Sequence, residues 1–175
     1  GCGSYSKIEG FGFIPVTCFS QALTTFIGQN LGAKEYDRAK KGALFGTICG
    51  IGIAEVIGIA VFFFSPYLIA AFGGDQKAIE YGIAEAHTIA LFYCLLAFSH
   101  CMAAIQRGAG RSIVPMFVMM IVWCGVRVTY ISIVIRIIPV INVIYWAYPL
   151  TWFISSVIFL ILFLKTDWIH GLEKQ

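Results

Sequence analysis

The chain has 175 residues, of which 59% are hydrophobic, 15% are aromatic and only 12% are charged. Soluble domains carry roughly 25% charged residues, so this composition, with a mean hydropathy of +0.86, excludes a soluble domain with a large core. It indicates an integral membrane protein whose partner is the lipid bilayer. The net charge of +3 is small and spread over loops, so it reports on topology and does not suggest a nucleic-acid partner.

The beginning of the sequence reads as the interior of a longer chain. It starts at Gly1 without a methionine. It also lacks the basic segment, short apolar stretch and small-residue cleavage site of a signal peptide. We therefore expect a piece of a longer protein.

Five segments are long and apolar enough to cross a bilayer as helices, since a spanning helix needs roughly 20 apolar residues. They are residues 8–27, 42–65, 81–105, 113–135 and 142–164. No alternating strand pattern with turn signals recurs. The expected fold is all-α with five transmembrane helices, and Pro66 is expected to end the second of them.

The least apolar of the five segments is 8–27, which carries a row of polar residues. Spacings of three and four keep these residues on one helix face: Thr17, Ser20, Gln21 and Thr24. Polar groups are costly against lipid, so this face should look at a neighbouring helix or at a water-filled cavity, and both readings stay open. Pro15 removes one backbone donor and is expected to bend the helix.

A charged loop follows at 28–42, where four of six charged residues are basic. Loop 106–112 and the tail after residue 164 are basic as well. Basic loops stay on the cytoplasmic side of a membrane, so we expect both loops and the C-terminus in the cytoplasm of a multi-pass protein of the cell membrane. Five spans then place the N-terminus outside, which suggests a missing preceding helix.

The segment 42–65 carries small residues at every fourth position. They are Gly42, Gly46, Gly50, Ala54 and Gly58. This repeat extends the GxxxG pattern through the whole span and predicts a close approach to another helix.

Two charged residues lie inside the expected spans. At 1.5 Å per residue, Glu55 lies about 20 Å, and Arg127 about 21 Å, from the start of its span. Both spans run outward, so the charges share a depth and we hypothesise that they meet directly or through water. An unpaired charge there would cost on the order of 3 kcal/mol. The pair is either a structural ion pair or a proton or ion relay.

Other ionisable residues have weaker signals. His100 lies about 10 Å from the cytoplasmic end of its span. It can be protonated at ordinary pH and join a relay, or it can simply hydrogen-bond between helices. Glu9 and Glu85 count out to the external interface, where we expect water to solvate them.

Cysteines give no sign of a metal site. Six of them lie mostly within apolar runs. None belongs to a CxxC pair, and no Cys/His cluster has the spacing of a zinc site. We expect small buried apolar residues, and we predict no metal and no cofactor beyond a coupling ion.

Two motifs resemble the multidrug and toxic compound extrusion (MATE) family. The first is SQALTTFIGQNLGA at Ser20–Ala33, and the second is RGAGRS at Arg107–Ser112. The resemblance covers nearly the whole chain and implies helices 8–12 of a twelve-helix, two-lobe transporter. Residues 1–175 would then be a partial C-terminal lobe, whose partner is the missing N-terminal lobe of the same chain.

The resemblance also implies an activity. Members of the family export organic, often cationic drugs by antiport against sodium or protons, and their drug pathway lies between the lobes beside the segment 8–27. The candidate pathway residues are therefore Pro15, Thr17, Gln21 and Thr24.

The sequence departs from the family at one position. Many members carry an acidic residue eleven positions before the arginine of the second motif, and Leu96 stands there in this sequence. Coupling would then rest on the missing lobe or on substitutes. The ion or proton relay candidates are Glu55, His100 and Arg127.

Three alternatives stay open. A flippase for lipid-linked substrates would suit the basic loops, and a packing subunit without transport would suit the glycine repeat. A membrane-embedded enzyme is disfavoured, because the sequence has no HExxH motif, paired carboxylates or Cys/His cluster. We therefore expect a protein that is not an enzyme.

Overall fold

The computed structural model describes residues 2–167 and residue 169 of the chain. Apart from turns and loops, this part of the chain is entirely helical. Its elements are α1 (Cys2–Gly32), α2 (Tyr36–Ala71), α3 (Gln76–Ile89), the 3₁₀ turn η1 (Ala90–Phe92), α4 (Tyr93–Gly108), α5 (Ile113–Met119), the π-helical segment η2 (Met120–Val126), α6 (Arg127–Ile137), α7 (Ile141–Tyr145) and α8 (Ala147–Lys165).

The helices form five apolar stretches long enough to cross a membrane, which confirms the all-α, five-helix expectation. They are Ser6–Gly32, Tyr36–Ala71, Gln76–Gly108, Ile113–Ile137 and Ile141–Lys165. Each stretch is longer than the segment predicted from the sequence, because the helices continue into the loops.

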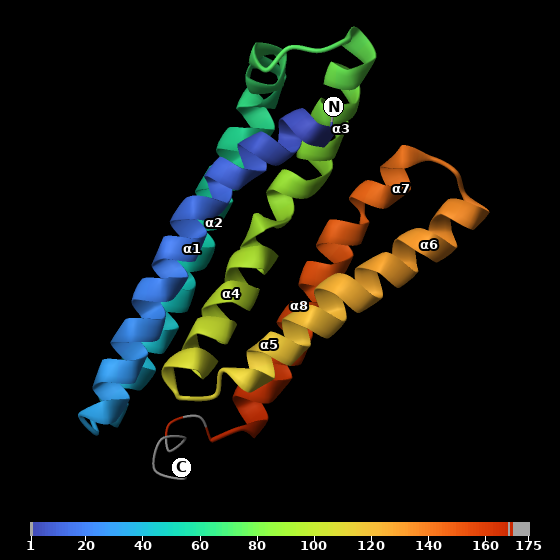
Figure 1. Cartoon of the computed structure of the whole chain (residues 1–175). Coiled ribbons are helices and arrows are strands. Elements are labelled where there is room, and N and C mark those ends of the chain that lie inside the picture. The colour runs from blue at the N-terminus through green and yellow to red at the C-terminus, as the bar shows by residue number, and fades with distance from the viewer. Residues whose placement is uncertain (1, 168, 170–175) are drawn as a thin grey trace.

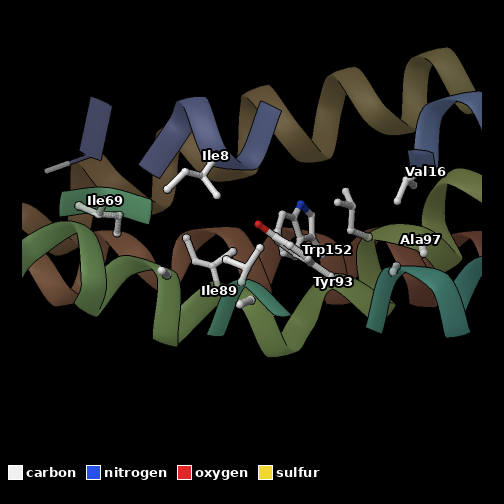
Figure 2. Packing of buried hydrophobic residues seen from close by; sticks show 12 residues of the cluster. Ile8, Val16, Ile69, Ile89, Tyr93, Ala97 and Trp152 are labelled. Atoms are coloured by element: carbon white, nitrogen blue, oxygen red, sulfur yellow. The ribbon is translucent and has the colours of Figure 1, made fainter. Parts of the chain in front are cut away.

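The expectation that Pro66 ends the second span is wrong. Pro66 lies inside α2, which continues to Ala71. The reason is packing: Ile69, in the last turn, is fully buried at 0% exposure and belongs to one cluster with Ile8 and Ile89 (Figure 2). Burial of this apolar turn outweighs the backbone hydrogen bond that proline removes.

The helices pack as two groups that meet at α4. On one side α1 and α2 contact each other and α4; on the other side α8 packs on α4 and is covered by α5, η2 and α6 (Figure 1). The N-terminal part of α1 tilts towards α3, in line with the bend expected at Pro15. This arrangement leaves α1 and α6 on opposite sides of α4.

Both basic loops lie at one end of the molecule. The α1–α2 connection, the α4–α5 connection and the C-terminal end of α8 are together there, and the α2–α3 and α6–α7 connections lie at the other end (Figure 1). Both basic loops can therefore lie on the same side of a membrane, as the topology predicted from charge requires. Lys174, one of the basic residues of the tail, lies outside the described residues.

The small-residue repeat of α2 is the surface on which α1 and α4 pack. A Cβ atom on Gly46 would lie 2.7 Å from Leu23 of α1, and one on Gly50 would lie 2.7 Å from Sγ of Cys101 on α4. At Gly58 it would overlap the carbonyl oxygen of Ala90 in η1. The predicted close approach is confirmed.

Candidate functional site

The polar row of α1 divides between an exposed and an inward-facing part. Pro15, Thr17 and Gln21 are exposed. Thr24 is half-buried, and its hydroxyl donates to the carbonyl oxygens of Ser20 at 3.0 Å and of Ala104 on α4 at 3.2 Å. Thr17 and Gln21 therefore stay available to a partner or to water, whereas Thr24 serves the contact between α1 and α4.

The two motif segments come together beside Thr24. A Cβ atom on Gly108 would lie 2.7 Å from the carbonyl oxygen of Thr24 and 2.8 Å from Cβ of Ile27. One on Gly28 would lie 3.4 Å from the carbonyl oxygen of Gly108. The glycines of the two motifs thus allow the backbones of α1 and α4 to touch at the end that carries the basic loops.

The hypothesis that Glu55 meets Arg127 is wrong. Glu55 lies on α2 and faces Cys94 at the start of α4, where its Oε2 atom is buried without a hydrogen-bond partner among the described residues. Arg127 lies at the start of α6, on the other side of α4 (Figure 1).

The guanidinium of Arg127 is held by α8 and by its own helix. Its Nη2 donates to the hydroxyl of Thr151 at 2.9 Å. The same group lies over the ring of Tyr148, 4.3 Å from the centroid, and 5.5 Å from the centroid of Trp123. These contacts fix the charge at one place, because cation–π and hydrogen-bond geometry both restrict a planar guanidinium.

A counter-charge for Arg127 comes from α1. Glu9 is half-buried, and its carboxylate is within electrostatic range of Arg127 and of Glu85 on α3. Glu85 is only 5% exposed. The expectation that water solvates both glutamates is therefore wrong for Glu85.

His100 of α4 lies between α1 and η2, closer than Arg127 to the end of the molecule that carries the basic loops. Its Nδ1 lies 3.0 Å from the carbonyl oxygen of Leu96 and must donate to it. The ring centroid lies 6.0 Å from that of Phe13 on α1 and 5.6 Å from that of Trp123 in η2. His100 thus connects α1 to η2 across α4.

One layer of side chains therefore bridges α1 and η2 across α4. It consists of Phe13, His100 and Trp123. The indole of Trp123 donates to the hydroxyl of Ser155 at 2.8 Å, which fixes η2 on α8.

Sequence reasoning singled out His100 and Arg127 but paired Arg127 with Glu55, and it missed Thr151 and Tyr148, which hold the guanidinium. The signal that could have found them is the polar and aromatic side chains of the last span, since a charge inside a membrane is nearly always paired or hydrogen-bonded. Among the described residues, no group of three or more His, Cys, Asp and Glu side chains could hold a metal ion.

Residues 1–133 match the family model MatE. The chain belongs to the MatE family.

Individual relatives agree with that assignment. The chain is similar to the "Probable multidrug resistance protein NorM" of Thermotoga maritima, with 29% identity over 118 residues, which cover 67% of this chain and 25% of that protein. It also resembles a solved structure described as an inward-facing conformation of a multidrug resistance MATE family transporter of the MOP superfamily. That match has a TM-score of 0.82 and 19% identity, and covers 94% of this chain and 37% of the other.

The MatE chain described here spans about a quarter of the length of the NorM relative, in line with a part of a larger transporter. The structural match shows that these five helices have the fold of a corresponding part of a MATE transporter.

Proposed function

We propose that the chain is part of a secondary-active exporter of organic, often cationic drugs, and that export is driven by the inward movement of sodium ions or protons. Membership of the MatE family and the printed names of its relatives support export. Such a transporter performs no covalent chemistry. Ion and drug each bias the exchange between an inward-facing and an outward-facing state by binding one of them better.

The observation that carries this proposal is the exposed polar surface of α1. Thr17 and Gln21 are exposed at mid-helix in a segment of mean hydropathy 1.3. Polar side chains at that depth face water or protein, not lipid. An aqueous drug pathway between this lobe and an N-terminal lobe of the same chain satisfies them.

Coupling needs an ion site within the membrane, and this lobe offers three half-buried ionisable groups from the sequence-based expectation: Glu55, His100 and Arg127. The basic loops 28–42 and 106–112 and the C-terminus lie on the cytoplasmic side in this proposal. The bilayer surrounds the apolar outer surfaces of α2 and α6.

Ethidium efflux from cells that carry the complete transporter tests the proposal. Gln21→Leu and Thr17→Val should each lower efflux, because they remove polar contacts from the pathway while keeping the side-chain size. Thr129→Val is the matched control, since Thr129 is an exposed threonine on α6 whose hydroxyl bonds to its own helix at Gly125. Absence of efflux under both a sodium and a proton gradient would refute the proposal.

A further inference from the structure

A groove of about 500 Å³ lies between α1 and α2, in the half of the molecule away from the basic loops. The side chains that form it recur at intervals of three and four residues, so each helix contributes one face. None of the described residues that line the groove carries a charge. The residues that shape it are Phe11, Gly12 and Pro15 of α1 and Ala60, Phe64 and Tyr67 of α2.

The groove lies where the small-residue repeat of α2 comes to its end. Within the repeat the helices are in close contact, since a Cβ atom on Gly46 would lie 2.7 Å from Leu23 of α1. The next position of the repeat is occupied by Phe62. At the level of the groove, Gly12 and Ala60 have almost no side chain, so space stays open between the two helices.

The depth of the groove coincides with the boundary between hydrocarbon and lipid headgroups. The charged loop ends at Lys41, so the hydrocarbon begins near Gly42. A hydrocarbon core of about 30 Å then ends about 20 residues later, near Phe62. The α2 residues of the groove extend from Ile57 to Leu68, which is from about 22 Å to about 39 Å beyond Gly42. One part of the groove therefore lies in hydrocarbon and the other part at headgroup level.

A cation lies at the headgroup end of the groove. Lys7 precedes Phe11 by one turn of α1, and its ammonium group lies 5.4 Å from the ring centroid of Phe72, the residue that follows α2. The exposed side chain of Lys7 therefore reaches from one helix to the other beyond Leu68. An ammonium group has three N–H donors, and the ring covers one side of it, so donors remain for an anionic oxygen.

The combination of an apolar groove and a cation at its outer end fits an amphiphile with an apolar chain and an anionic head. The positive charge of Lys7 repels a cationic drug. A small hydrophilic anion gains nothing from an apolar groove. A membrane phospholipid has both required parts, and the bilayer already holds it at this depth, with its acyl chain in the hydrocarbon and its phosphate at headgroup level.

We propose that the groove between α1 and α2 binds an acyl chain of a phospholipid with an anionic headgroup, and that Lys7 binds the phosphate of this lipid. The rings of Phe11, Phe64 and Tyr67 form the apolar walls against which the chain packs. The lipid then joins α1 to α2 beyond the small-residue repeat. Lipid binding of this kind goes beyond drug export and does not depend on it.

The experiment uses the complete transporter in liposomes that contain a trace of phosphatidylglycerol with a photoreactive diazirine in one acyl chain. After illumination, peptide mass spectrometry measures the lipid adducts in residues 8–15 and 57–68. Unlabelled phosphatidylglycerol should compete for these adducts about fivefold better than phosphatidylcholine at the same mole fraction, because this is the effect of one lysine near a membrane surface on an anionic lipid.

Two variants separate the groove from the cation. Ala60→Leu fills the groove and should remove most of the adducts, whereas Ala70→Leu is the control, since Ala70 is an exposed alanine of α2 that does not line the groove. Lys7→Gln should keep the adducts but lose the fivefold preference for phosphatidylglycerol. Its control is Lys77→Gln, which changes an exposed lysine in the first turn of α3 at the same end of the molecule.

Equal competition by the two lipids in the wild type would overturn the inference, and so would an unchanged preference in Lys7→Gln. Absence of adducts in both segments would also overturn it, because a helix of the N-terminal lobe would then fill the groove. Adducts that ethidium displaces and neither lipid displaces would assign the groove to the drug and refute lipid binding. Export itself is measured separately by efflux, so each of these results leaves the proposed function standing.

Discussion

Replacement of Gly58 by alanine tests whether α2 is held by backbone contact. The added methyl group would overlap the carbonyl oxygen of Ala90 and would lie 3.2 Å from its carbonyl carbon. Backbone atoms cannot rotate away as the end of a side chain can, so α2 and η1 must separate. Gly52→Ala is the matched control on the same helix, since nothing lies within 4 Å of a Cβ atom there.

The expected magnitude comes from two opposing terms. Alanine favours a helix over glycine by about 1 kcal/mol, and this gain applies to both variants. Overpacking costs about 1–3 kcal/mol and applies only to Gly58→Ala. The difference between the two variants cancels the helix term and isolates the packing term, which should make Gly58→Ala less stable than Gly52→Ala by about 1–3 kcal/mol.

Thermal unfolding of the purified transporter in detergent measures this difference. Each kcal/mol lowers Tm by about 2–4 °C in a chain of this length, and a larger protein would show a smaller shift in the same direction. Equal Tm values for the two variants would refute the reasoning, because they would mean that α2 and η1 do not touch at Gly58.

Three further predictions concern two side-chain contacts and the membrane topology. Arg127→Lys should destabilise the protein by about 1 kcal/mol in the same unfolding assay, because an ammonium group cannot stack on Tyr148 as a guanidinium does. Trp123→Phe should cost about 1 kcal/mol through the lost hydrogen bond to Ser155, and full stability in this variant would contradict the bond. With the native cysteines replaced, a membrane-impermeant maleimide should label Glu35→Cys only from the cytoplasmic side and Asp75→Cys only from outside; the reverse pattern would invert the topology.

The existence of the five membrane helices could be predicted because the bilayer fixes their length. An apolar run of roughly 20 residues has few alternatives to a spanning helix. The ends of the helices were less predictable. Pro66 is a local signal to stop, but the apolar residues after it have a buried place beside Ile8 and Ile89, and that contact is between segments far apart in the sequence.

The partner of Arg127 was not predictable, because counting residues gives the depth of a side chain but not its direction. Successive helix residues differ by about 100° in direction, so the depth of Glu55 does not reveal that its side chain faces Cys94 of α4. The direction of Arg127 depends in addition on the π-helical segment η2 that precedes it. Each π-bulge adds one residue to a helical turn and rotates everything after it.

The sequence of η2, Met120–Val126, has no polar or charged side chain and contains no proline, so no local pattern marks the change of helix type. The bond from Trp123 to Ser155 on α8 is consistent with a tertiary cause. Tertiary packing therefore decides the direction of Arg127, whose guanidinium is held by Thr151 and Tyr148 of α8.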